Sequence, residues 1–226
     1  MDQQLWDDIR EDLKGLFVGD RTLGDSFLAP ILFVAINSVY GLGAAAVGAG
    51  AAGLAVAGWR VQRGQQVSYA MGGIVSIILA GMLALRSGRA ESFFLPGIFA
   101  ATFLAGLALI SLIVRRPLFA WSSHAYRQWP LEWYWRSDVR PAYALVTGMW
   151  ALFFAFRAAL QFWFFVTEQP GLLAVAKVVT SWPLLVPLFI ASYAVGNRKL
   201  HALGGPNVEE FMLGSPAPYS GLQRGF

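Results

Sequence analysis

Residues 26–59 read SFLAPILFVAINSVYGLGAAAVGAGAAGLAVAGW and contain no charged side chain. A helix needs about 20 predominantly apolar residues to cross the ~30 Å hydrocarbon core of a bilayer. One continuous helix of this stretch would be roughly 50 Å long, which is too long for a single crossing. Because residues 40–43 (YGLG) offer a turn near its middle, we predict a tight hairpin of two short spans. The alternative is one long helix, and therefore a chain with five spans.

The composition of the whole chain agrees with a membrane protein. Of its 226 residues, 57% are hydrophobic and 13% are charged, against roughly 25% charged residues in a soluble domain. The 24 glycines and 9 tryptophans suit membrane helices, in which glycine and interfacial tryptophan are frequent. The absence of cysteine excludes disulfides, thiolate metal sites and cysteine nucleophiles. A net charge of +4 would suggest nucleic acid in a soluble protein, but no nucleic-acid partner is expected here.

The sequence predicts an all-α fold, a polytopic integral membrane protein with six transmembrane helices and an N-terminal amphipathic helix. Lys and Arg accumulate in cytoplasmic loops, and thirteen of the seventeen fall on one side of the predicted helices. We therefore place the protein in the cytoplasmic (inner) membrane with both termini in the cytoplasm. The predicted spans are residues 25–41, 43–59, 66–85, 91–115, 139–167 and 171–196.

Three regions follow from this pattern. Residues 1–24 contain apolar residues at helical spacing beside an acidic face, and they are expected to form an amphipathic cytoplasmic helix and linker. Its excess of carboxylates would be repelled by an anionic leaflet, so we expect it to dock on basic loops of the same chain, around Arg60, Arg63, Arg115 and Arg116. Residues 25–198 form the transmembrane domain. Residues 199–226 are rich in Gly, Pro and Ser and are predicted to be a flexible cytoplasmic tail.

Small residues recur at four-residue intervals on three spans and should mark close helix packing. They are Ala45, Ala49, Gly53 and Ala57 on the second span, Gly72, Ser76, Ala80 and Ala84 on the third, and Gly97, Ala101 and Ala105 on the fourth.

Polar residues at membrane depth supply the candidate site. Each Arg or Lys near the centre of a membrane helix costs about 2.5 to 3.5 kcal/mol on insertion scales, so it needs a partner. Arg157 and Gln161 share a face of the fifth span, and Lys177 lies on the sixth. The tentative ligand-binding residues, which would form an outward-facing cationic cavity, are Arg157, Gln161, Lys177, Arg86, Arg89, Glu91, Glu168 and Asn37. The alternative is internal pairing of Arg157 and Lys177 with Glu168 and Glu91.

Residues 117–135 (PLFAWSSHAYRQWPLEWYW) contain four of the nine tryptophans. An aromatic belt in the headgroup layer explains them, with a lid over a ligand as the alternative. Neither His124 nor His201 has further ligands at metal-binding spacing, so we expect no metal and no cofactor. The chain contains no catalytic motif that we can assign to an enzyme class, and no catalytic residue is named.

Three strings resemble a known family. They are RSGRAESFFLPG (86–97), RRPL (115–118) and WALFFAFR (150–157), and they are similar to the largely actinobacterial membrane family catalogued as domain of unknown function 3159. The basic-Pro-Leu junction and the Trp-Ala-x-Phe-Phe helix are more distantly similar to the intracellular septation protein A family. The resemblance implies a polytopic inner-membrane protein and brings no established catalytic residues.

Three functions follow from the sequence. The first is a non-enzymatic envelope-maintenance or scaffold protein that acts through membrane-protein partners or a second copy of itself. The second is a carrier or binder of an anionic or lipid-linked molecule, with membrane lipids as partners. The third is a membrane-embedded enzyme that modifies a lipid.

Overall fold

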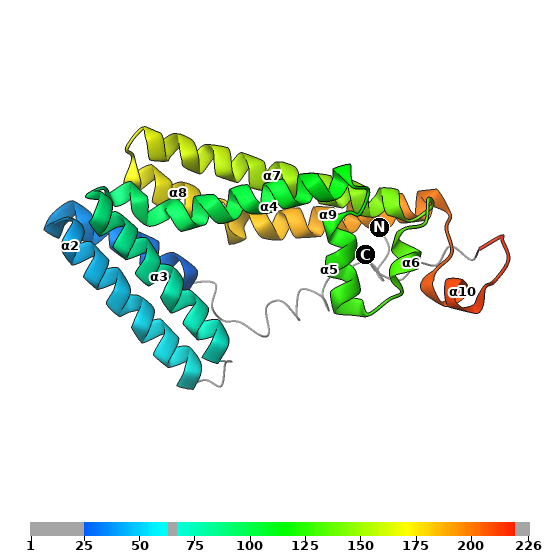
Figure 1. The fold of residues 1–226 in the computed structure, drawn as a ribbon, viewed down its shortest axis with the longest axis horizontal. Coiled ribbons are helices and arrows are strands. Elements are labelled where there is room, and N and C mark those ends of the chain that lie inside the picture. Colours follow the sequence, from blue (N-terminus) through cyan, green and yellow to red (C-terminus); the bar gives the residue numbers. More distant parts are fainter. Residues whose placement is uncertain (1–24, 63–66, 220–226) are drawn as a thin grey trace. The chain divides into compact units, whose positions relative to one another are not determined.

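The computed structural model describes residues 25–62 and 67–219, and these residues are helical with no strand among them (Figure 1). The helices are α2 (Asp25–Gln62), α3 (Val67–Ser87), the 3-10 turn η1 (Ala90–Phe94), α4 (Leu95–Ile113), α5 (Leu118–Arg127), α6 (Leu131–Tyr134), α7 (Arg140–Val166), α8 (Pro170–Val179), α9 (Trp182–Leu203) and α10 (Val208–Leu213). The predicted all-α fold is confirmed. The predicted N-terminal helix and its docking lie outside the described residues.

Four helical stretches are long and apolar enough to cross a membrane: Pro30–Trp59, Ala90–Ile113, Arg140–Val166 and Pro170–Leu203. A fifth apolar helix, Ile74–Ser87, is shorter. The helices begin and end close to the ends of the predicted spans. The ends of both follow from where a long apolar run starts and stops. That the chain crosses the membrane six times stays a prediction.

The long helix α2 consists of two segments that bend apart at Gly41. This residue has φ 81° and ψ 174°, in a region that glycine enters without steric cost. A methyl group on Gly48 would lie 2.5 Å from Cδ1 of Ile36, whereas two such residues in a straight helix would be about 18 Å apart. The two segments are therefore folded against each other at the glycine turn expected from residues 40–43.

The predicted small-residue faces are largely buried. Ala45 and Ala49 of α2 pack with Ala80 and Ala84 of α3 around Phe33. A methyl group on Gly53 would lie 2.5 Å from Cδ1 of Ile77, so glycine permits α3 to approach there. Ala101 and Ala105 of α4 are buried as well, whereas Ser76 is exposed.

The chain divides into two compact units. Among the described residues, one unit contains 25–62, 67–101 and 157–183, and we call it the hairpin unit. The other contains residues 102–156 and the described chain from 184 onward, and we call it the aromatic unit.

The aromatic unit has a core of large rings from the segment that was expected to form a membrane belt. Trp133 and Tyr134 are 1% and 0% exposed and stack edge-to-face on Tyr143. Tyr134 shares a hydrogen bond with Ser123 of α5, and burial raises the pKa of its phenol. Trp121 and Tyr126 remain 45% and 78% exposed. The segment is thus part core and part surface.

The structure also differs from the predicted flexible tail. Leu200 is buried in the aromatic core, and the Trp133 indole donates a hydrogen bond to the carbonyl of Pro206. Asn207 then starts α10 with a capping box, in which it and Glu210 satisfy each other's backbone N–H groups. These contacts hold residues that composition alone predicts to be a loop.

Candidate functional site

The candidate site lies in the hairpin unit, where the chain turns from α7 into α8 and then breaks. Thr180 and Ser181 separate α8 from α9, and Pro183 follows them. Proline has no N–H to continue the hydrogen-bond ladder, and carbonyls at a helix end lack intrahelical partners. With ten residues, α8 is about 15 Å long, or half the ~30 Å hydrocarbon core. The break therefore falls about half the thickness of a hydrocarbon core from the start of α8.

Arg157 of α7 binds the broken end of α8. Its Nη1 donates a hydrogen bond of 3.1 Å to the carbonyl oxygen of Thr180. Helix C-termini carry partial negative charge, so a cation is favourable at this position. Gln161, one turn further along α7 and 1% exposed, lies 3.5 Å through its Nε2 from the hydroxyl of Thr180.

Lys177 lies in the last turn of α8, three residues before Thr180. Its Nζ lies 5.7 Å from the centre of the Phe94 ring. Within the described part of the chain, neither cation contacts a carboxylate, and the Nε of Arg157 is buried without a hydrogen-bond partner. Arg157, Gln161, Lys177 and Thr180 form what we call the buried cation group, in which Gln161 and Thr180 are buried and the two cations are half-buried.

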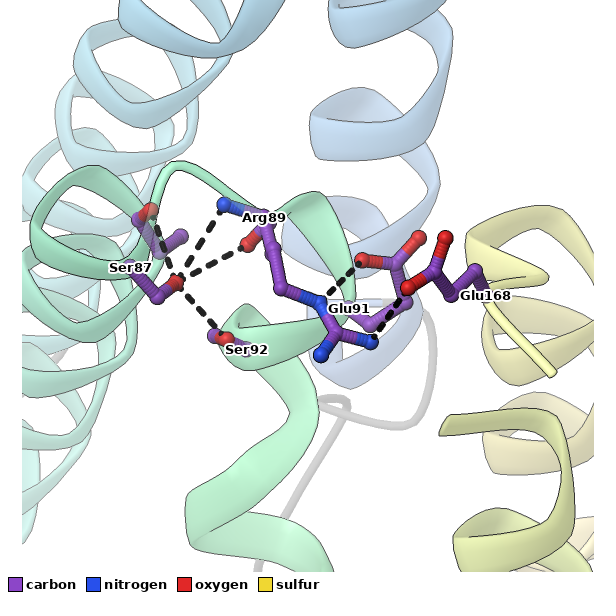
Figure 2. A network of polar contacts seen from close by, with 6 residues as sticks. Ser87, Arg89, Glu91, Ser92 and Glu168 are labelled. Atoms are coloured by element: carbon purple, nitrogen blue, oxygen red, sulfur yellow. Dashed lines mark hydrogen bonds and ion pairs between the residues drawn. The ribbon is translucent and has the colours of Figure 1, made fainter. Parts of the chain in front are cut away.

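The carboxylates that would neutralise this group in the internal-pairing alternative contact Arg89 instead. Figure 2 shows the Arg89 guanidinium between Glu91 and Glu168, with N···O distances of 3.7 and 3.2 Å. Its Cζ also lies 5.3 Å from the centre of the Phe165 ring. Glu91 is buried in η1, whereas Glu168 is exposed in the turn after α7.

A serine pair supports this ion-pair cluster from the other side. The Ser87 hydroxyl donates a hydrogen bond of 2.8 Å to the Ser92 hydroxyl and accepts one of 3.3 Å from the backbone N–H of Arg89 (Figure 2). Gly88, with φ 67°, provides the sharp turn between them. The cluster thus joins the loop after α3 to the turn between α7 and α8.

The structure therefore separates the eight candidate residues. Arg157, Gln161 and Lys177 form the buried cation group, and Arg89, Glu91 and Glu168 form the ion-pair cluster. Arg86 is exposed at the end of α3, and Asn37 is half-buried just before the Gly41 turn. Sequence reasoning missed Thr180 and Phe94. Pro183 and Pro187 predict a kink in this span, and the polar pair Thr180 and Ser181 just before Pro183 marks the break.

Two other features of the site bear on its chemistry. No three His, Asp or Glu side chains among the described residues are grouped closely enough to hold a metal ion. The buried cation group combines two positively charged donors, Arg157 and Lys177, with a neutral amide and a neutral hydroxyl, and charged donors suit the recognition of an anion.

These features define an all-helical protein with four helices suited to crossing a membrane and a polar group between two of them. The chain matches, over residues 17–203, the family described as Protein of unknown function (DUF3159), and it belongs to this family. Comparisons with curated proteins and with solved structures find no match.

Proposed function

We propose that the protein binds the anionic group of a membrane lipid or lipid-linked molecule at the buried cation group. The observation that carries this proposal is that Arg157 and Lys177 have no carboxylate partner among the described residues. Two uncompensated cations at membrane depth would cost about 5 to 7 kcal/mol on insertion scales. A bound phosphate or carboxylate offsets that cost, and the free Nε of Arg157 offers it a donor.

The alternative of internal pairing has less support. Glu91 and Glu168 already contact Arg89, so their carboxylates are held where the loop after α3 meets the turn after α7. The scaffold and enzyme functions considered from the sequence are not carried forward, because no described contact favours either of them.

The proposed topology has six crossings. The two segments of α2 fold against each other, and η1 contacts α2, α3 and α8. Together with the Arg89–Glu168 ion pair, this arrangement supports a common end for the Gly41 turn, the loop after α3 and the turn after α7. Three loops on one side are what six alternating crossings require. The Lys and Arg distribution supports placing this end outside and both termini in the cytoplasm of the cell membrane.

The direct test is lipid analysis of the full-length protein purified from its membrane in mild detergent. Extracted lipids are quantified by mass spectrometry per mole of protein. We expect an anionic lipid or lipid-linked anion at about one molecule per chain, enriched over its share of the membrane. Retained lipids that merely mirror the composition of the membrane would contradict the proposal.

A further inference from the structure

The buried cation group carries two positive charges that the described part of the chain does not balance. Arg157 and Lys177 contact no carboxylate among the described residues. The buried carboxylate of Glu91 is paired with Arg89, and the Glu168 side chain is 69% exposed, so its charge is solvated. The partial negative charge at the end of α8 is offset by the opposite charge at the start of α9, which follows closely in the chain.

Both cations lie well inside stretches suited to crossing a membrane. Arg157 is nine residues before the end of α7, and Lys177 is seven residues after the start of α8. These separations correspond to roughly 10 to 14 Å along each helix. The Nζ of Lys177 lies beside the Phe94 ring, which is buried together with Leu173. A charge that stays unbalanced in such apolar surroundings is unfavourable.

The site offers two charged donors that are not used within the described chain. The Nε of Arg157 is buried without an acceptor, and the Nζ of Lys177 has no acceptor among the described residues. A zwitterionic lipid would bring an ammonium group, but Glu91 and Glu168 already contact Arg89. A polar headgroup would bury further hydroxyl groups against apolar side chains, which is costly unless each finds a partner. These features favour a phosphate without a headgroup.

Building on the anionic lipid site proposed above, we propose that the lipid's phosphate is a monoester, with two negative charges and no further headgroup. Such a phosphate balances both Arg157 and Lys177. A phosphodiester such as phosphatidylglycerol carries one negative charge and leaves one cation unbalanced in apolar surroundings. The phosphodiester therefore binds at the same place but more weakly.

The test compares phosphatidic acid with phosphatidylglycerol of identical acyl chains, each titrated into the delipidated full-length protein in detergent. At about pH 7.5 the monoester carries close to two negative charges, because its second pKa is about 6. Native mass spectrometry measures the dissociation constant of each lipid. We expect phosphatidic acid to bind about tenfold or more tightly, because it leaves no charge unbalanced.

Lys177→Gln leaves one cation at the site and should remove most of the preference for phosphatidic acid, while phosphatidylglycerol still binds. Lys177→Arg keeps the charge and should keep the preference. If Lys177 were only structural, Lys177→Gln would weaken both lipids alike, and that result would overturn the proposal. Arg86→Gln, at an exposed position at the end of α3, is the control that should change neither affinity. If Lys177→Gln fails to fold, the ratio of the two dissociation constants in the unmodified protein still decides.

Two further outcomes separate this proposal from the anion site itself. Equal affinities for the two lipids, both lost in Arg157→Leu/Lys177→Leu, would overturn the monoester and leave the anion site standing. Binding of both lipids that this variant retains in full would overturn both proposals.

Glycerol 3-phosphate has the same phosphate group without acyl chains, and it distinguishes a lipid from a soluble ligand. We expect that an equal concentration of it does not displace phosphatidic acid, because the acyl chains contribute to binding. Full displacement would overturn the lipid, since the site would then bind a soluble phosphomonoester.

Discussion

Replacing Arg157 and Lys177 together with leucine is expected to reduce anionic lipid retained through purification by about tenfold or more. A hydrogen bond to a charged group contributes about 1.5 to 3 kcal/mol, and 1.4 kcal/mol corresponds to a tenfold change in affinity. The protein should remain folded, because leucine suits the apolar surroundings and removes two desolvated charges. Lipid mass spectrometry per mole of protein measures the loss, and gel filtration in detergent checks the fold.

Two controls separate this prediction from internal pairing. Arg86→Leu removes an exposed arginine at the end of α3 and should leave lipid retention unchanged. Glu91→Gln with Glu168→Gln removes the two carboxylates that contact Arg89, and it should also leave retention unchanged. A folded Arg157→Leu/Lys177→Leu variant that retains the lipid fully would show that these cations do not bind it.

The largest effect on stability is expected for Trp133→Ala. This side chain is 1% exposed, packs on Tyr134 and Tyr143, and donates to the carbonyl of Pro206. Truncating a buried tryptophan costs about 3 to 5 kcal/mol in the free energy of unfolding. The measurement is unfolding in detergent, followed by circular dichroism.

Trp121→Ala is the matched control, because Trp121 is 45% exposed and lies only 12 positions earlier in the chain. Its expected loss in detergent is below about 1 kcal/mol, since surface substitutions have small effects. Trp133→Phe keeps an aromatic ring but removes the indole donor. Its loss in the free energy of unfolding should therefore lie between those of Trp121→Ala and Trp133→Ala. Equal losses for Trp133→Ala and Trp121→Ala would mean that the aromatic core does not stabilise the fold.

Much of the helical architecture could be predicted because its signals are local. The ends of α3, α4 and α7 follow from where apolar runs stop. Gly41 was expected at a turn because glycine in a run of that length marks a break, and it has the positive φ that glycine favours. The buried faces of α2 and α3 follow from the spacing of small residues.

The partners of the charged residues could not be predicted, because they depend on tertiary placement. Arg157 and Glu168 share a helical face in the sequence, yet Arg157 binds the end of α8 and Glu168 binds Arg89 across the loop. Trp121 and Trp133 lie 12 positions apart in the same aromatic segment, but one is exposed and the other buried. The helix α10 was not predicted because Gly and Pro indicate a loop, whereas the hydrogen bond from Trp133 to Pro206, just before α10, spans 73 positions.

The most direct test of the central claim is to map where an anionic lipid headgroup binds. The purified protein is incubated with a phosphatidylglycerol that carries a photoreactive group beside its phosphate, and the adducts are located by peptide mass spectrometry. The account predicts adducts within residues 157–161 or 177–181 that excess unlabelled phosphatidylglycerol suppresses and that the Arg157→Leu/Lys177→Leu variant lacks. Adducts at other positions with none in these two segments would contradict it.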